Sequence, residues 1–191
     1  LPQLLAEAVG QQALIEGWLR QCDAMSADRG YVLLGDFNAD GDLEIAALRP
    51  EGDGGRLAIF DPVAVNVPAG HDKYMAGVAW DLLYSLPLVD RPGVLVSGDF
   101  DPARPGAELL YSEVPPEEQI RKGAPIRVTV VRGAGAMPDG RSWEVMASYA
   151  SAFNWTWAAS GDADGEGADE VALIDRTAGN LTLFHVTNTL A

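Results

Sequence analysis

Short apolar runs bounded by polar turn residues recur along the chain, and this pattern is typical of strands rather than of long helices. In the clearest examples, an apolar run enters a group of acidic residues around a glycine, and a second apolar run follows. This arrangement occurs as YVLLGDFNADGDLEIAAL at 31–48, as VLVSGDFDPARPGAELLYS at 94–112, and as WAASGDADGEGADEVALID at 157–175. The Gly-Asp pairs begin at Gly35, Gly98 and Gly161, so both steps of the repeat are 63 residues long.

Each repeat contains four apolar segments of strand length, and alternation of apolar and polar residues within them predicts antiparallel strands. We expect a tryptophan-bearing strand first, then one that enters the Gly-Asp pair, a third after the acidic loop, and a fourth that closes the unit. The expected strands, in that order, are near Trp18, 78–84 and 142–149; 31–37, 94–100 and 155–163; 43–48, 107–112 and 170–174; and 56–60, 126–131 and 181–186. Polar turn segments connect the third and fourth strands, and the middle one, 115–125, is the longest.

This organisation predicts an all-β fold, in which three repeats of about 63 residues form four-stranded antiparallel blades of a partial β-propeller. The expected blades are about 12–62, 74–132 and 141–188 within a single domain, 1–191. Closed propellers have about four to eight blades, so three blades leave two open ends. We therefore expect a protein partner or a second copy of the chain to cover those ends.

The segment before the first acidic loop fits both helical and strand spacing. Trp18 lies 17 residues before Gly35, whereas Trp80 and Trp143 each lie 18 residues before their Gly-Asp pairs. This similar spacing favours a strand at about 15–22, with a short helix or arm before it.

The composition is that of an ordinary globular protein: 191 residues, 48% of them hydrophobic and 21% charged. A formal net charge of −15 opposes nucleic acid or anionic lipid as a partner and suits a cation binder or an exported protein. A single cysteine, Cys22, excludes an internal disulfide, and two histidines give no Cys/His zinc set. The sequence has no apolar run of about 18 residues, so no membrane span is predicted in this segment. A first residue of Leu1 is compatible with a signal peptide or anchor upstream.

The first acidic loop has the spacing of a metal-binding loop. Counted from Asp36, side-chain oxygens fall at positions 1, 3, 5 and 9, a glycine stands at position 6, and position 7 offers a backbone carbonyl. These residues are, in the same order, Asp36, Asn38, Asp40, Glu44, Gly41 and Asp42. Alternate residues of a tight loop point to the same interior, and carboxylates this close need a compensating cation. Calcium, which takes about six to eight oxygen ligands, fits best.

An EF-hand is the obvious alternative, because its loop begins with the same pattern. It requires a bidentate glutamate at position 12, and that position is Ala47 in the first loop and Leu173 in the third. An acid at position 9, directly before an apolar strand, instead predicts a calcium loop within a β-hairpin.

The third loop repeats the pattern of the first, whereas the second departs from it. The third offers oxygens at positions 1, 3, 5 and 9 around Gly167, and a carbonyl at position 7, from Asp162, Asp164, Glu166, Glu170 and Ala168. The second keeps Asp99, Asp101 and Glu108 as weaker candidates, but it lacks the acid at position 5 and gains one residue. The guanidinium of Arg104 is a candidate to replace the ion there. We therefore predict two calcium ions, with the second loop as a third candidate; a solvated hairpin turn is the alternative for any single loop.

The GDFN, GDFD and GDAD segments, each followed by a glycine, an acid and an apolar strand, resemble the FG-GAP or VCBS repeats of integrin-α-like β-propellers. The resemblance covers nearly the whole chain. It implies four-stranded blades, calcium in the acidic loops, an extracytoplasmic setting, and roles mostly in adhesion or assembly. The Phe-Gly and Gly-Ala-Pro signatures of the integrin version are absent, so the looser bacterial-type repeat is the nearer comparison.

No catalytic residue is predicted, because the sequence contains no nucleophile elbow and no phosphate-binding loop. The leading interpretation is a non-catalytic, calcium-stabilised β-propeller module for protein–protein assembly or adhesion, as an accessory subunit of an extracytoplasmic or envelope complex. A carbohydrate-binding, lectin-like propeller is the alternative, since alternation places Trp155 and Trp157 on one strand face. A calcium-dependent hydrolase comes third. Extracellular calcium modules bind at roughly 10⁻⁴ to 10⁻³ M, which favours a periplasmic, cell-surface or secreted location.

Overall fold

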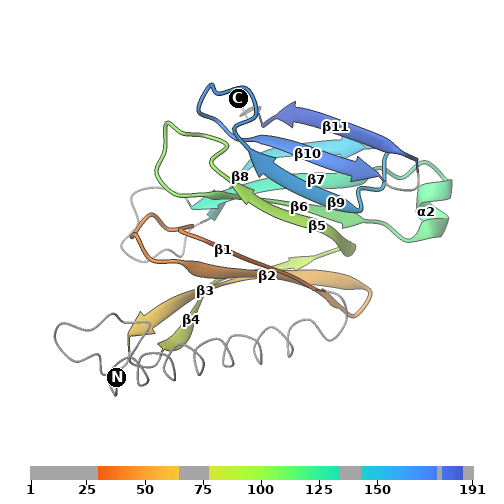
Figure 1. Cartoon of the computed structure of the whole chain (residues 1–191). Coiled ribbons are helices and arrows are strands. Elements are labelled where there is room, and N and C mark those ends of the chain that lie inside the picture. The colour runs from red at the N-terminus through yellow and green to blue at the C-terminus, as the bar shows by residue number, and fades with distance from the viewer. Residues whose placement is uncertain (1–29, 65–77, 134–142, 176–177, 187–191) are drawn as a thin grey trace, which may run out of the picture.

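The structure is a computed structural model, and it describes residues 30–64, 78–133, 143–175 and 178–186. Within these ranges eleven strands form three antiparallel sheets, and one short helix, α2 (Glu117–Arg121), lies in a connection (Figure 1). No helix among the described residues is long and apolar enough to cross a membrane. The all-β prediction is confirmed for this part of the chain.

The first sheet contains four strands in sequence order: β1 (Tyr31–Gly35), β2 (Glu44–Glu51), β3 (Gly54–Ala64) and β4 (Val78–Leu88). The first acidic loop joins β1 to β2, and Gly35 lies opposite Glu44 at its base. A tight turn at Gly52 joins β2 to β3, and the φ of 61° at this position favours glycine. Consecutive strands are therefore hairpin neighbours, which is the arrangement that short connections allow.

The second sheet repeats this order with β5 (Arg91–Gly98), β6 (Glu108–Val114), β7 (Ile126–Gly133) and β8 (Trp143–Ser151). Helix α2 lies between β6 and β7, within the segment predicted as a polar connector. Two ion pairs spaced four residues apart support it, Arg121 with Glu117 and Lys122 with Glu118. The third sheet has three described strands, β9 (Trp157–Gly161), β10 (Glu170–Asp175) and β11 (Asn180–His185), in the order β11-β10-β9.

The tryptophan-bearing strands close their sheets instead of opening them. Strand β4, with Trp80, pairs with β3, and β8, with Trp143, pairs with β7. The expectation that these strands begin the second and third repeats is therefore wrong, and the first two sheets end after Leu88 and Ser151. The reason is that alternation identifies a strand but not the neighbour with which its backbone pairs. The strand expected near Trp18 lies outside the described residues.

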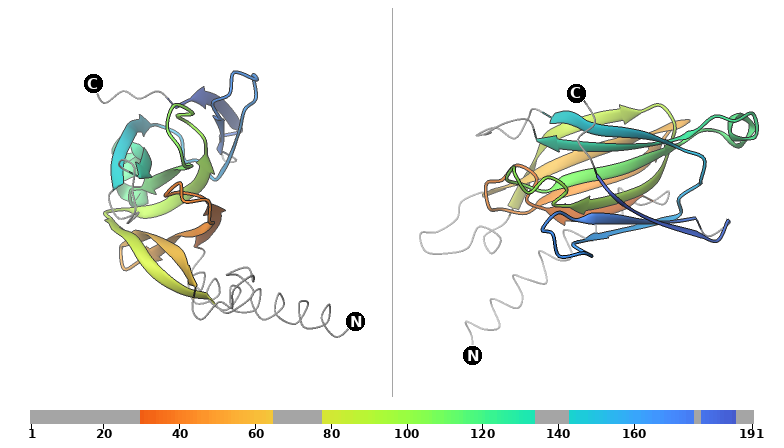
Figure 2. Two further views of the ribbon diagram at one scale, coloured as in Figure 1. Left: turned by 90° about the vertical axis from the view of Figure 1, so that its left-hand side faces the viewer. Right: turned by 90° about the horizontal axis from the view of Figure 1, so that it is seen from above.

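The three sheets are stacked in sequence order (Figures 1 and 2). We call the face of a sheet that points toward the next sheet its forward face, and the opposite one its rear face. The forward face of the first sheet packs on the rear face of the second through Ala46, Leu48, Leu57 and Ile59 on one side and Leu95, Leu109, Tyr111 and Val131 on the other. The forward face of the second packs on the rear face of the third through Val94, Val96, Leu110, Val128 and Val130 on one side and Val171, Leu173 and Phe184 on the other.

The first strands of the three sheets, β1, β5 and β9, lie next to one another. Two side-chain hydrogen bonds join them, because the Tyr31 hydroxyl donates to the Gly93 carbonyl and the Ser160 hydroxyl donates to the Ser97 carbonyl. Since each acidic loop follows the first strand of its sheet, this contact brings the three loops to the same end of the stack.

Candidate metal centre

The first acidic loop wraps its backbone amides around Asp36. The amide of Asp40 donates to Oδ1 of Asp36 over 3.1 Å, and the amide of Gly41 donates to Oδ2 over 3.0 Å. The turn needs positive φ at Ala39 (63°) and Gly41 (89°), and glycine adopts such a conformation without strain. The predicted glycine at position 6 therefore lets the loop close over position 1.

Glu44 is the buried acid of this loop. It is the first residue of β2 and is 0% exposed. Its Oε2 accepts hydrogen bonds from the amides of Phe37 (2.6 Å) and Asn38 (3.2 Å), whereas Oε1 has no partner among the described residues. Burial raises the pKa of Glu44 to about 7 despite these bonds, and the carboxylates of Asp40 and Asp36 add to the rise. An ionised Glu44 is therefore costly unless a cation compensates it.

Three of the predicted ligands come together in the first loop. Asp36, Asp40 and Glu44 each offer a carboxylate oxygen within 4.8 Å of the other two. Asn38 and Asp42 instead form hydrogen bonds with the carboxylate of Asp40. Nδ2 of Asn38 donates to Oδ2 of Asp40 (3.1 Å), and the amide of Asp42 donates to Oδ1 of Asp40 (2.8 Å). The clustered oxygens are hard donors of the kind that calcium takes, and further oxygens from Asn38, backbone carbonyls or water would complete a set of about six to eight.

The third loop is built in the same way. The amides of Gly165 (2.7 Å) and Gly167 (3.2 Å) donate to the carboxylate of Asp162. Glu170, the first residue of β10, is 3% exposed, and its Oε2 accepts a hydrogen bond from the amide of Ala163 over 2.7 Å. In the described part of the chain, its Oε1 forms no hydrogen bond. As in the first loop, the buried glutamate of the third loop therefore has one carboxylate oxygen with a hydrogen bond from a described residue and one without.

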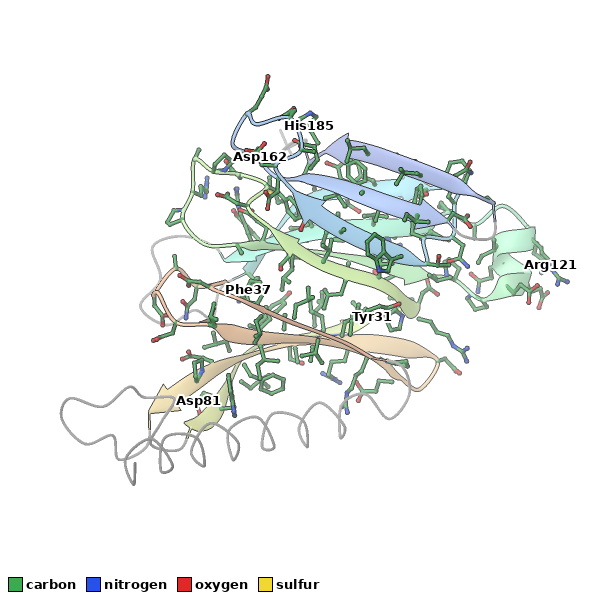
Figure 3. All side chains as sticks on the ribbon, viewed as in Figure 1. Tyr31, Phe37, Asp81, Arg121, Asp162 and His185 are labelled. Atoms are coloured by element: carbon green, nitrogen blue, oxygen red, sulfur yellow. The ribbon has the colours of Figure 1, made fainter. Side chains whose placement is uncertain are left out.

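His185 is a site residue that the sequence reasoning missed. It ends β11 and lies opposite Glu170 in the register. Its Nδ1 is 2.9 Å from Oε1 of Glu170, and its Nε2 is 3.5 Å from Oδ2 of Asp164. These three residues form the second cluster in which all ligand atoms lie within 4.8 Å, and Figure 3 shows His185 and Asp162 at the same end of the third sheet.

The other ligands predicted for the third loop lie outside this cluster. Asp162 binds loop amides, and Glu166 is exposed, with its amide donating to Oδ1 of Asp164 over 3.0 Å. Ala168, predicted to lend a carbonyl, is half-buried beside the start of β10. Of the carboxylates predicted here, the structure therefore gathers Asp164 and Glu170.

In the second loop, a cationic side chain lies among the acids. Glu108 is buried, and its Oε2 accepts hydrogen bonds from the amides of Phe100 (2.7 Å) and Asp101 (3.3 Å). Burial raises the pKa of Glu108 to about 7, with a further contribution from nearby Asp99 and Asp101. Among the described residues, Asp99, Asp101 and Glu108 do not form a cluster comparable to the other two.

The buried cation of the second loop is Arg132 of β7, not the predicted Arg104. Arg132 is 7% exposed, and it donates to Asp101 Oδ2 and Glu144 Oε1, both over 2.7 Å. Arg104 is half exposed and stays 4.0 Å from Asp101 and 3.8 Å from Glu144. The prediction that the guanidinium of Arg104 pairs with Asp101 is therefore confirmed, although the ion pair is long. The buried and closer Arg132 was not predicted, because it lies on a strand that follows much later in the chain.

One position in each sheet faces the glutamate that follows the acidic loop. Glu170 pairs directly with His185. In the first two sheets, the ladders Ile45↔Phe60 and Leu109↔Val131 place Asp61 and Arg132 next to Glu44 and Glu108, one residue further along. This position, which we call the partner position, is thus occupied by Asp61, Arg132 and His185 in the three sheets.

The charge at the partner position differs at each loop. Asp61 makes the first loop more acidic, and burial, followed by Asp40 and Asp81, raises the pKa of Asp61. Its Oδ1 is buried without a hydrogen bond from any described residue. Arg132 neutralises the second loop through its two carboxylate partners. Of the three loops, the first therefore carries the most negative charge without a compensating cationic side chain among the described residues.

Backbone hydrogen bonds also link each acidic loop to the next. The amide of Ala107 donates to the carbonyl of Asp36, and the amide of Asp169 donates to the carbonyl of Asp99, both over 2.8 Å. Oδ2 of Asp169 in turn accepts from the amide of Asp99 over 2.9 Å. A cation that orders one loop would therefore also order the contact between two sheets.

The tryptophans proposed for sugar stacking lie in different environments. Trp155 precedes β9, is 5% exposed and belongs to the core between the second and third sheets, whereas Trp157 is 54% exposed. The prediction that both lie on one strand face is therefore wrong, because the strand begins only at Trp157. Trp143 stacks on Tyr84 with ring centroids 5.3 Å apart, as expected of a core tryptophan between neighbouring sheets.

In comparisons with known proteins, no family model matches the chain, and no curated protein matches it either.

Proposed function

We propose that the chain is a non-catalytic, calcium-stabilised β-propeller module that supports protein–protein assembly or adhesion outside the cytoplasm, as an accessory subunit of an envelope or extracytoplasmic complex. The assembly role is carried by one observation, the exposed apolar forward face of the third sheet. The acidic loops support the calcium role, and the repeated stacking of the sheets supports the propeller.

Successive sheets are related in the same way, because the first strand of each sheet lies beside the first strand of the next. Forward faces cover rear faces twice, between the first and second sheets and between the second and third. A ring of such sheets is a β-propeller, and further sheets added by the same relation would continue the arc. This regularity, together with the 63-residue repeat, is the basis of the propeller proposal.

The forward face of the third sheet is apolar and exposed. Trp157, Leu181 and Leu183 are 54%, 68% and 57% exposed. The ladders align Trp157 and Leu181 with Ile174 in one row of this face. Exposed apolar surface of this kind, concentrated on one face, is typical of an interaction site.

The equivalent positions of the second sheet are covered. Val94, Val128 and Val130 correspond to Trp157, Leu181 and Leu183, as the ladders pair Leu110 with Val130 and Ala172 with Leu183. All three valines are at most 2% exposed, because the third sheet packs on them. The partner that fits the free face is therefore a β-sheet with an apolar rear face of the same kind.

Light scattering of the full chain, before and after polar substitution of the free face, tests the assembly role. Leu181→Ser with Leu183→Ser should abolish association with a partner or second copy and leave the secondary structure unchanged, because both side chains are exposed. A matched exposed substitution away from this face, Val89→Ser, should leave association unchanged. A wild-type chain that neither self-associates nor retains a protein from its native extract would contradict the assembly role.

A sugar-binding role finds less support. Trp157 is exposed, but its neighbours on the same face are leucines rather than the polar groups that orient sugar hydroxyls. Trp155, the other tryptophan predicted for sugar stacking, is buried in the core.

A further inference from the structure

We propose that the third acidic site takes a divalent transition-metal ion of the zinc class, through Asp164, Glu170 and His185. The inference deepens the proposed function by assigning a different ion to this loop. It shares with that function the idea that the loops bind cations, but it does not depend on calcium in the first loop.

The register is the first step of the argument. The partner position faces the glutamate of each loop, and it is Asp61 in the first sheet, Arg132 in the second and His185 in the third. An aspartate adds a hard oxygen, a guanidinium replaces an ion, and an imidazole adds a nitrogen donor. The three loops therefore share one scaffold, while the residue at the partner position sets which cation each of them suits.

The geometry of the cluster is the second step. Two ligands bound at about 2.0–2.2 Å from one ion lie about 2.8–3.6 Å apart for angles between octahedral and tetrahedral. Nδ1 of His185 is 2.9 Å from Oε1 of Glu170, and its Nε2 is 3.5 Å from Oδ2 of Asp164. Nδ1 of His185 therefore lies at ligand–ligand distance from the buried Oε1 of Glu170 and is the nitrogen that we assign to the ion. Asp164 completes the set, because one ligand atom from each of the three residues lies within 4.8 Å of the other two.

The buried glutamate supplies an independent observation. Glu170 is 97% buried, because its exposure is 3%. Its Oε2 is fixed by the Ala163 amide, whereas Oε1 faces the cluster and forms no hydrogen bond with any described residue. The contact with Nδ1 is thus close without the geometry of a hydrogen bond. An oriented, desolvated oxygen of this kind needs a positive partner, which is either a bound cation or His185 itself in its protonated form.

The donor set selects the class of ion. Imidazole nitrogen suits zinc and similar transition metals, whereas calcium takes oxygen ligands. Zinc takes both histidine nitrogen and carboxylate oxygen as ligands, and three protein ligands leave a fourth position for water. The first loop offers carboxylates alone and has no histidine at the partner position, so the same ion has no comparable site there.

Titration calorimetry of the full chain with Zn²⁺, Ca²⁺ and Mg²⁺ tests the proposal. We expect one Zn²⁺ site that His185→Asp, a copy of the first sheet's partner residue, weakens at least tenfold while strengthening Ca²⁺ binding at the same loop. His71→Ala, which removes the chain's other histidine, should leave Zn²⁺ affinity unchanged. Unchanged Zn²⁺ affinity in His185→Asp would overturn the proposal.

Nitrogen-15 spectra of the wild-type imidazoles give a readout that does not depend on any variant folding. Zn²⁺ should shift the Nδ1 resonance of His185 to the range of a metal-bound nitrogen. If His185 instead keeps the spectrum of an imidazolium in excess Zn²⁺, it replaces the ion in the manner of Arg132, and the proposal is wrong. Asp40→Asn separates the two hypotheses, because it should remove calcium from the first loop and leave the Zn²⁺ response intact.

Discussion

Replacing Glu108 with glutamine should change how the stability of the protein depends on pH. Glu108 is 1% exposed, and burial raises its pKa from 4.5 to about 7, while its hydrogen bonds to the amides of Phe100 and Asp101 act in the opposite direction. At 1.36 kcal/mol for each pKa unit, this rise corresponds to about 3 kcal/mol. Glutamine has the same shape and retains an acceptor for both amides, so the substitution removes the titration while preserving the hydrogen bonds.

The sign follows from the direction of the rise. Because the folded protein binds the proton of Glu108 more tightly than the unfolded chain does, the stabilisation is complete below pH 4.5 and is lost as the pH rises through 7. The wild type should therefore lose about 3 kcal/mol of unfolding free energy between pH 4.5 and pH 8 through this group. Glu108→Gln should not show that loss, and should be the more stable protein at pH 8.

Urea unfolding between pH 4.5 and 8.5 measures this difference. Both proteins should be saturated with calcium, so that Glu44, whose pKa is also raised, does not titrate over the same range. The two stability curves should approach each other near pH 4.5 and separate toward pH 8. Parallel curves across the whole range would refute the argument, since they would mean that burial of Glu108 carries no proton-linked cost.

Two further substitutions test the second loop and the sheet contact, each against a matched control. Arg132→Met should destabilise the protein by about 3 kcal/mol in urea unfolding, because it leaves Asp101 and Glu144 facing each other without their buried cation. The control Arg104→Met should cost less than about 1 kcal/mol, because the Arg104 side chain is half exposed. Gly98→Ala should lower the free energy of unfolding by about 1–3 kcal/mol, because the new Cβ would lie 2.9 Å from Oδ2 of Asp169 and 2.6 Å from the Phe100 ring. The equivalent Gly161→Ala has no atom within 4 Å of the new methyl group and should change the melting temperature very little. Equal effects within either pair would contradict the corresponding contact.

The strands and the acidic loops were predictable because their signals are local. Apolar runs around each Gly-Asp pair placed β1, β2, β5, β6, β9 and β10 close to their observed positions. Counting positions from Asp36 also identified Glu44, which the fold buries behind the loop. In these segments, the periodicity and the turn glycines act within about twenty residues of one another, so no knowledge of tertiary contacts is needed.

The partner position was not predictable in this way. His185 follows Glu170 by 15 residues, and Arg132 follows Glu108 by 24, so only the register of the next hairpin brings them together. The sheet to which Trp80 belongs could not be predicted for the same reason. The alternation around Trp80 indicates a strand but does not show that this strand pairs with β3. Helix α2 is a different case, because the charge pattern of its acidic first turn and basic last turn is local, yet the segment is predicted as a polar connector.

The most direct test of the calcium claim is the thermal unfolding midpoint of the full chain in calcium and in excess chelator, for the wild type and for Asp40→Asn. Asp40 is exposed and belongs to the first cluster, so the substitution should remove a ligand without harming the fold. At a calcium concentration of about 100 times Kd, binding to the folded state alone should add about 2.7 kcal/mol and raise the wild-type midpoint. The account predicts that chelator reverses this rise and that Asp40→Asn loses most of it. An equal midpoint with and without chelator, or a full calcium response in Asp40→Asn, would contradict it.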